Sequence, residues 1–360
     1  MNYLRYAPGV ETVDDGEQEA IDGIIKAMTH QSEIVAKREH HAVRASHAKS
    51  TALVTGTLTI EPDLPPELAQ GLFATPASYD VAIRFAQGPG ETLSDHVSTH
   101  RGMAVKIFGV TGDKLGSHRS DTQDFVFASG PTFPSGTAKG FLRDEKLLET
   151  STPMPEGVKS AVSSAMRATN TLLKVFGTQS AFADFFGHPF SHPLSEPYFS
   201  QAPYRYGDYV AKLAFVPSDP AMLKLVGQTL DPAADPNVFR TAMTEFLRSN
   251  DAEFEVQVQL WANPDSQPLE DTSVEWPETD SVYRTVATIS IPAQASYSDA
   301  RERYFDDVLS FKPAHTLSSH RPLGSVMRAR LQVYDALSRF RHENNRVAVE
   351  EPNGVDQIPA

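Results

Sequence analysis

The sequence predicts one α+β domain, with a large antiparallel sheet or barrel and helices before, within and after it. Three observations lead to this fold class. Short strand-like runs are separated by clusters of Gly, Pro and Asp, as is typical of antiparallel strands. Helical patterns occur near the beginning, in the middle and at the end of the chain. No repeat, low-complexity block or linker divides the 360 residues, a length that is sufficient for one large core.

The individual elements follow from these patterns. A first helix is expected from Gly16 to Arg38, where apolar residues recur at helical spacing and the first turn is acidic. Strands are expected next at Ala52–Ile60, Val81–Phe85, Gly102–Phe108 and Phe125–Ala128. After a mostly helical stretch come the later strands, at Tyr209–Phe215, Phe254–Trp261 and Thr285–Ile291. The helical stretches are Val158–Phe186 in the middle and Gly324–Arg346 near the end.

These elements divide the chain into three parts. Residues 1–40 are interpreted as an N-terminal helical arm, and residues 41–346 as the sheet or barrel domain with its C-terminal helices. The tail, 347–360, contains two prolines and a glycine and is expected to be loose.

Composition excludes several classes of function. The formal net charge of −14 repels nucleic acid and anionic membranes, so neither is an expected partner. No apolar run approaches the roughly 18 to 20 residues that span a bilayer. The N-terminus lacks the basic and apolar regions of a signal peptide, which favours a cytoplasmic protein. The absence of cysteine excludes disulfides, thiolate ligands and cysteine nucleophiles.

A tyrosine near the end of the chain is a candidate metal ligand. On a helix, Arg330 lies four residues before Tyr334 and Arg341 lies seven residues after it, so all three share one face. The arginine would stabilise the phenolate form of Tyr334. A phenolate is a good ligand for ferric iron, including the iron of haem. The alternative is a core aromatic residue beside a surface arginine.

Two earlier residues are candidates for acid/base chemistry and for anion binding. His47, between Arg44 and Lys49, is either a general acid/base or a solvated loop residue. Arg84 lies in the strand-like run Val-Ala-Ile-Arg-Phe, where a buried charge needs an anionic partner. That partner is either a haem propionate or a carboxylate of the protein itself.

Taken together, the motifs resemble those of the catalase superfamily in order and surroundings. They are Arg-x-x-His-Ala-Lys at 44–49, Ile-Arg-Phe at 83–85, Arg-Gly-Met-Ala-Val-Lys at 101–106 and Arg-x-x-x-Tyr at 330–334. The resemblance extends over 207–212, 268–276 and 310–324, and covers roughly Arg38 to Arg341. It is strongest to the compact catalase-related proteins, which implies a catalase-like barrel surrounded by helices and without an extra C-terminal flavodoxin-like domain.

The resemblance also implies a haem b cofactor and roles for its neighbours. Tyr334 would ligate the iron as a phenolate that Arg330 keeps ionised, and His47 would be the acid/base on the peroxide side. Phe141 lies ten residues after Pro131 and matches the phenylalanine that stacks on the distal face of the haem. The propionate-binding arginines of the family correspond to Arg44, Arg84 and Arg341.

The chain departs from the family near the distal histidine. The family's asparagine before the Pro-x-Phe of the next strand is replaced by Ala128 or Ser129, and the serine that supports the histidine is Ala86. The residue before the histidine is Ser46, whose hydroxyl could bond the imidazole. A hydroxyl residue there is a feature of the catalase-related allene oxide synthases. We therefore include Ser46 and Ser129 among the distal residues and expect hydrogen peroxide dismutation to be weak.

The sequence thus predicts an enzyme that reduces organic hydroperoxides and hydrogen peroxide with an external donor and retains residual catalase activity. One alternative is a fatty-acid hydroperoxide isomerase or lyase of the allene oxide synthase type, acting on a lipid hydroperoxide. Another is a haem or lipid carrier without turnover, against which an acid/base at His47 argues. Self-association into a homo-oligomer is left open.

Overall fold

A computed structural model describes residues 2–175 and 180–359; residues 176–179, in the expected helical middle, lie outside the described part, as do the two terminal residues. Within it, eight strands close into an antiparallel barrel in the order β5-β4-β3-β2-β1-β9-β8-β7, with β7 pairing back to β5. A further strand, β6, pairs with β7. The strands are β1 (Ser50–Ile60), β2 (Ser78–Ala86), β3 (Gly102–Phe108), β4 (Thr122–Ala128), β5 (Tyr198–Phe199), β6 (Tyr204–Tyr206), β7 (Tyr209–Pro217), β8 (Ala252–Leu260) and β9 (Arg284–Ile291). The predicted fold class is confirmed.

The barrel closes around a packed apolar interior. Alternate residues of β8 are buried, as expected where one face of a strand points to the core. All eight barrel strands contribute to the main cluster of buried apolar residues, in which Phe127 stacks on Phe215 with ring centroids 4.4 Å apart. Burial of these side chains is the main stabilising contribution to the barrel.

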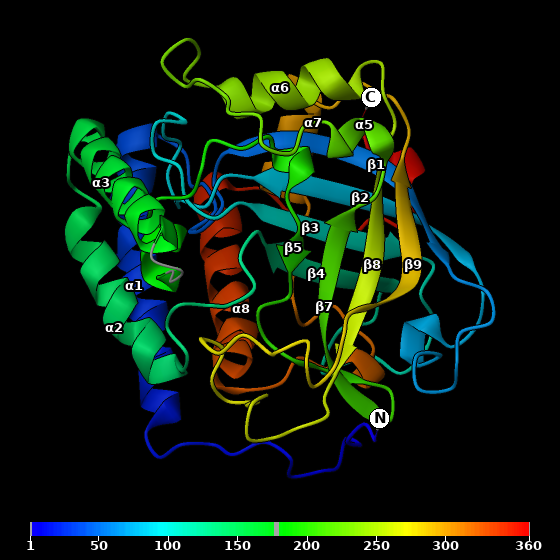
Figure 1. Ribbon diagram of the computed structural model, residues 1–360. Coiled ribbons are helices and arrows are strands. Elements are labelled where there is room, and N and C mark those ends of the chain that lie inside the picture. The colour runs from blue at the N-terminus through cyan, green and yellow to red at the C-terminus, as the bar shows by residue number, and fades with distance from the viewer. Residues whose placement is uncertain (1, 176–179, 360) are drawn as a thin grey trace.

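The helices lie on two sides of the barrel (Figure 1). Three of them, α1, α2 and α8, pack on one another through a second apolar cluster beside the barrel. The helices are α1 (Glu17–Glu39), α2 (Ala138–Ser151), α3 (Glu156–Val175), α4 (Ala181–Phe186), α5 (Pro220–Leu223), α6 (Val238–Leu247), α7 (Asp299–Arg303) and α8 (Ser325–Asn345). Single turns are η1 (Gly71–Phe73), η2 (Pro193–Ser195), the π-type η3 (Tyr304–Val308), η4 (Ser318–His320) and η5 (Val355–Gln357).

Residues near both ends of the chain contact the barrel domain. The side chain of Glu351 forms an ion pair of 2.8 Å with Lys106, which is completely buried. Arg301 Nε donates to the carbonyl of Pro359 over 2.9 Å. An isolated charge on Lys106 would be costly to bury, so the tail carboxylate helps to compensate it. At the other end, α1 belongs to the helical cluster and does not extend away from the domain.

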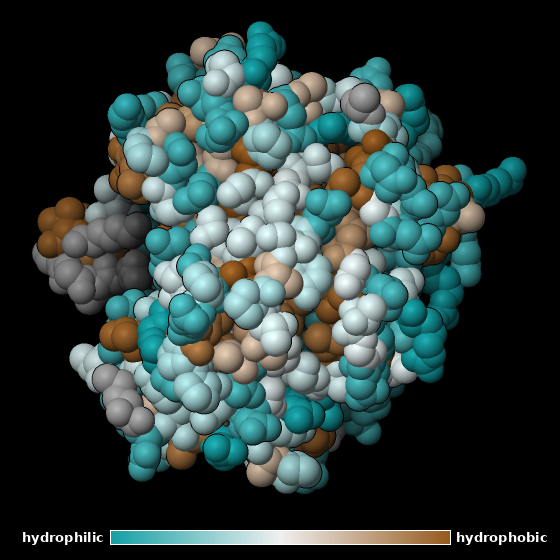
Figure 2. All heavy atoms as spheres, turned by 90° about the vertical axis from the view of Figure 1, so that its right-hand side faces the viewer, coloured by the Kyte–Doolittle hydropathy of each residue, from teal (hydrophilic) through white to brown (hydrophobic). Residues whose placement is uncertain are grey.

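The surface is mixed in character. On the face shown in Figure 2, hydrophilic residues are interspersed with smaller groups of hydrophobic ones. Among the helices that the structure describes, none combines the length and apolarity needed to cross a membrane.

Candidate functional site

The register of the first four strands brings the candidate distal residues to one end of the barrel. Ser50 pairs with Ala86, Ala86 with Gly102, and Gly102 with Ala128. The start of β1, the end of β2, the start of β3 and the end of β4 therefore form one rim, which we call the site rim. Residues just beyond these ends are brought together although they are far apart in sequence.

His47 lies in the loop that precedes β1 and is held there by its backbone. Its φ of +56° is in the left-handed region, which is uncommon for a residue with a side chain. Its N–H donates to the Gly88 carbonyl over 2.9 Å, and its carbonyl accepts from Arg84 Nη2 over 2.7 Å. A Cβ on Gly102 would lie 2.7 Å from His47 Nδ1, so the absence of a side chain at Gly102 makes room for the imidazole.

The electrostatic surroundings keep the His47 imidazole uncharged. Burial lowers the pKa of His47 to about 3, and the positive charges of Arg84 and Arg330 act in the same direction. Its Nδ1 is buried and has no hydrogen-bond partner among the described residues. Ala86 pairs with Gly102, and cross-strand partners project to the same face, so the Ala86 side chain lies on the face of the sheet toward the imidazole.

The two candidate serines do not bond this imidazole in the structure. Ser46 is exposed, and its hydroxyl donates to the Gly88 carbonyl over 3.3 Å, so the bond to the imidazole suggested by the sequence is not formed. Ser129 is buried, accepts from the Arg101 N–H over 3.0 Å and lies 3.4 Å from His188 Nε2. Its hydroxyl is therefore directed to a different polar network.

Two of the candidate propionate arginines share a carboxylate that sequence reasoning missed. Arg84 Nε donates to Asp306 over 2.7 Å, and Arg44 Nη1 donates to the same carboxylate over 3.2 Å. The hydroxyl of Ser50 donates to both of its oxygens. For Arg84, the structure thus shows the internal carboxylate, the second of the two partners considered from the sequence. Asp306 lies in the π-type turn η3, and no sequence pattern marks it.

Arg341 gives this cluster an excess of positive charge. Its side chain is buried, its Nη2 contacts His342 Nε2 at 3.1 Å, and its Nε has no partner among the described residues. Burial lowers the pKa of Arg341 to about 10, and Arg84 contributes in the same direction. Burial also lowers the pKa of Arg44 well below its usual value, reinforced by Arg341 and Arg84. Three arginines thus lie near one shared carboxylate.

The predicted pair on the last helix is present. Arg330 Nη2 donates to the Tyr334 hydroxyl over 3.1 Å, and the guanidinium carbon lies 5.5 Å from the centre of the phenol ring. Burial alone lowers the pKa of Arg330, but the oxygens of Tyr334 and Tyr204 outweigh it and raise that pKa above its usual value. The arginine is thus a permanent cation placed against the phenol of Tyr334.

Phe141 has a packing role that accounts for its position. It lies on α2 in the helical apolar cluster and contacts Phe133 edge to face, with ring centroids 5.1 Å apart. Ala45, two residues before His47, packs against the same cluster. The ring therefore lies near the distal loop, and its contacts are those of a core residue.

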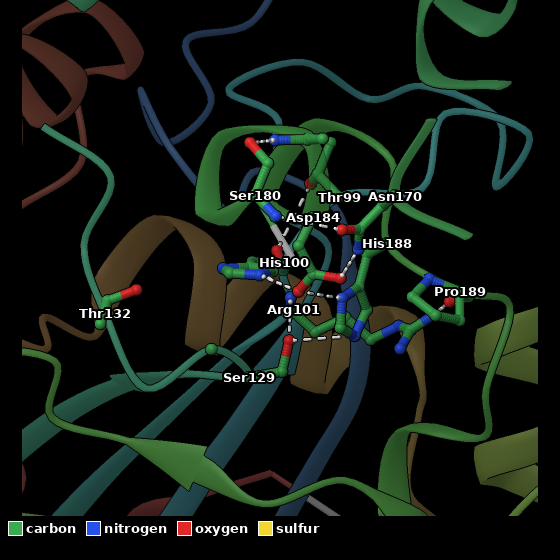
Figure 3. A network of polar contacts seen from close by, with 12 residues as sticks. Thr99, His100, Arg101, Ser129, Thr132, Asn170, Ser180, Asp184, His188 and Pro189 are labelled. Atoms are coloured by element: carbon green, nitrogen blue, oxygen red, sulfur yellow. Dashed lines mark hydrogen bonds and ion pairs between the residues drawn. The ribbon is translucent and has the colours of Figure 1, made fainter. Parts of the chain in front are cut away.

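Sequence reasoning also missed a buried polar network next to the site rim (Figure 3). It contains His100, Asp184, His188 and Glu196, together with Arg101. The one signal visible in the sequence is the spacing of four residues between Asp184 and His188. Their contact with His100, more than eighty residues earlier, depends on the fold.

Comparison with known proteins identifies the fold. No protein-family model matches the chain, and no curated protein matches its sequence. Its structure is similar to a fungal catalase, with a TM-score of 0.59 and 16% identity over 95% of this chain and 66% of that one. Catalase A from Saccharomyces cerevisiae gives a TM-score of 0.56 and 15% identity over 95% and 67% of the two chains. A bacterial catalase gives 0.58 and 15% over 98% and 67%. The chain spans about two thirds of the length of these structures, and the likeness establishes the fold.

Proposed function

Because the chain has a catalase-like fold, we propose that it is a haem-dependent enzyme that processes peroxides, with Tyr334 as the iron ligand. The observation that carries the proposal is that His47 lies within electrostatic range of the pair formed by Arg330 and Tyr334. Arg330, which bonds the Tyr334 hydroxyl, also acts electrostatically on His47, from the other end of the sequence. A phenol supported by a cation and an uncharged imidazole therefore belong to one site.

The residues present are compatible with a large anionic cofactor. Arg44, His47 and Arg330 each keep part of their surface accessible, although burial is the largest influence on the pKa of each. The unpartnered Arg341 Nε and the excess of positive charge around Asp306 would suit propionate groups. Arg341 is the best placed of the three arginines, because Arg44 and Arg84 are already engaged with Asp306.

Haem b held by Tyr334 would supply the redox chemistry: cleavage of the peroxide O–O bond and storage of the two oxidising equivalents that the peroxide releases. The protein's own contribution is to position and to move a proton. The uncharged His47 can take a proton from a bound peroxide at Nε2 and return it to the leaving oxygen. Its pinned backbone and its packing on Gly102 hold the ring in place for both transfers. Arg330 holds the Tyr334 hydroxyl in position through its hydrogen bond.

We propose that the enzyme reduces peroxides with an external donor more efficiently than it dismutates hydrogen peroxide. Dismutation requires a second hydrogen peroxide to be held and oriented in the site after the first has been reduced to water, so that the second can be oxidised to O₂. The chain has Ala128 or Ser129 at the position where an amide would help to hold it. The hydroxyl of Ser129 is engaged by Arg101 and His188. Reduction by a donor needs only the proton transfers of His47, so organic hydroperoxides are acceptable substrates.

A spectrum of the haemin-reconstituted protein tests the cofactor assignment. Wild type should show a high-spin ferric phenolate complex, and Tyr334→Phe should lose it. Tyr209→Phe, a conservative change on β7 away from this helix, serves as the matched control and should retain it. An unchanged spectrum in Tyr334→Phe would show that another residue ligates the iron.

Activity assays separate the candidate reactions. Donor oxidation with cumene hydroperoxide should exceed oxygen evolution from hydrogen peroxide, and His47→Ala should reduce both by about 10²- to 10⁴-fold. Oxygen evolution at rates typical of catalases would contradict the preference for reduction. Consumption of a lipid hydroperoxide without any donor would instead indicate the isomerase.

A further inference from the structure

A histidine–aspartate cluster lies beside the site rim, outside the proposed haem site. His100 immediately precedes Arg101 and β3, Asp184 lies on α4, and His188 follows that helix. His100 Nε2 is 2.8 Å from Asp184 Oδ2, and His188 Nδ1 is 3.4 Å from the same oxygen. One potential ligand atom from each residue lies within 4.8 Å of the other two. Figure 3 shows the three side chains directed toward one another.

Two of the three separations are near those of a small transition-metal site, and the third, between the two histidine nitrogens, lies within 4.8 Å and would have to close where it exceeds the tetrahedral value. Zinc binds imidazole nitrogen and carboxylate oxygen at about 2.0 to 2.2 Å, so tetrahedral ligand atoms lie roughly 3.3 Å apart. The separation of His188 Nδ1 from Asp184 Oδ2 already has this value, and that of His100 Nε2 needs to open by about 0.5 Å. Three protein ligands would leave a fourth position for water or another donor.

The surrounding residues orient the ligand atoms. Glu196 Oε1 lies 2.8 Å from His188 Nε2, so the proton of a neutral His188 belongs on that nitrogen and the lone pair of Nδ1 faces Asp184. Arg101 Nη1 in turn donates to Glu196 over 2.5 Å. Asn170 Nδ2 donates to Asp184 Oδ1 over 2.6 Å. The two histidines face the other oxygen of this carboxylate, Oδ2. A carboxylate behind a ligating histidine and a hydrogen bond behind a ligating carboxylate are regular features of zinc sites.

A second observation points to a ligand at the same place. His188 is 8% exposed, yet its Nδ1 makes no hydrogen bond among the described residues, and its charged neighbour Asp184 Oδ2 is 3.4 Å away. A buried nitrogen without a partner is costly unless something binds it. The competing explanation is a proton: the carboxylates of Glu196 and Asp184 raise the pKa of His188, although burial alone lowers it.

We propose that His100 Nε2, His188 Nδ1 and Asp184 Oδ2 form a binding site for a divalent transition-metal ion, zinc by its ligand preference. The ion would fasten α4 to the start of β3. It would lie close to Ser129, because Ser129 contacts both Arg101 and His188. None of its three ligands is a residue assigned to haem binding, so zinc binding can be measured without haem.

Zinc binding to the full-length protein tests the proposal. After treatment with a chelator, wild type should bind one Zn²⁺ per chain in calorimetric titration and melt at a higher temperature with Zn²⁺ than without it. Asp184→Asn keeps the shape of the side chain and should weaken binding by 100-fold or more, and His188→Gln should do the same. His30→Ala is the matched control, because His30 is an exposed histidine paired with Glu149, and it should bind as wild type does.

The results are interpretable even if one variant folds poorly. Co²⁺ bound to wild type should give the visible absorption bands of a nitrogen- and oxygen-ligated ion, and Zn²⁺ should displace them. The proposal is overturned if wild type binds no Zn²⁺ tightly. In that case His188 is protonated, and its two N–H groups face the carboxylates of Asp184 and Glu196. It is also overturned if folded Asp184→Asn and His188→Gln bind Zn²⁺ with wild-type affinity.

Discussion

Replacement of Gly102 by alanine should displace the His47 imidazole and reduce peroxide turnover. The added Cβ would lie 2.7 Å from His47 Nδ1, about 0.7 Å inside an ordinary contact of 3.4 Å. The imidazole cannot easily retreat, because its backbone N–H is bonded to Gly88 and its carbonyl to Arg84. Overpacking of this kind costs about 1 to 3 kcal/mol in stability. A displacement approaching 1 Å can cost a reaction about 10²-fold.

The assay measures kcat/KM for donor oxidation with cumene hydroperoxide, together with the melting temperature. Gly157→Ala is the matched control, because no atom lies within 4 Å of the added Cβ and its backbone is not left-handed. Combined with His47→Ala, the Gly102 change should add almost nothing, since the displaced group is gone. Wild-type turnover and melting temperature in Gly102→Ala would refute the reasoning, as would an equal further loss in the double variant.

Four further changes test other parts of the structure. Ala86→Ser should give the unpartnered His47 Nδ1 a hydrogen bond of about 1 kcal/mol and raise turnover several-fold; unchanged or lower turnover would contradict this. Asp306→Asn should lower the free energy of unfolding by about 3 to 5 kcal/mol in urea titrations, because two buried arginines lose their shared anion. Burial raises the pKa of Glu145 to about 7, so the folded state prefers the neutral acid and loses that stability as pH rises through 7. Glu145→Gln should therefore match wild type near pH 4 and exceed it at pH 8 by on the order of 3 kcal/mol, and equal stabilities at pH 8 would show that the carboxyl is not held neutral. Deletion of 347–360 should lower the melting temperature, because the tail carboxylate on buried Lys106 is lost, whereas a truly loose tail would leave it unchanged.

The barrel strands and the long terminal helices could be predicted because their periodicity is local. The run Thr285–Ile291 alternates clearly, and β9 occupies Arg284–Ile291. In contrast, β5 has only two residues, too few for any alternation, and it was not predicted. The helix α2 (Ala138–Ser151) was also missed; only three of its residues, Ala138, Phe141 and Glu145, are buried.

The candidate site was predictable only where its residues share a local motif. The contact of Arg330 with Tyr334 follows from helical geometry and is present. The partner of Arg84 could not be foreseen, because Asp306 lies more than two hundred residues away in an irregular turn. The same applies to His100 and Asp184, which the register of β3 and the position of α4 bring together.

The shortness of β5 determines how the barrel wall is held shut. Nine residue pairs join β1 to β2, whereas β4 meets β5 at a single pair, Ala128 with Phe199. This seam is secured by side chains: the completely buried Tyr198 packs on Phe85 and donates its hydroxyl to the Pro193 carbonyl over 2.9 Å. Local opening there breaks few backbone hydrogen bonds, so the seam is where amide protons should exchange first and where the barrel wall should yield under thermal stress.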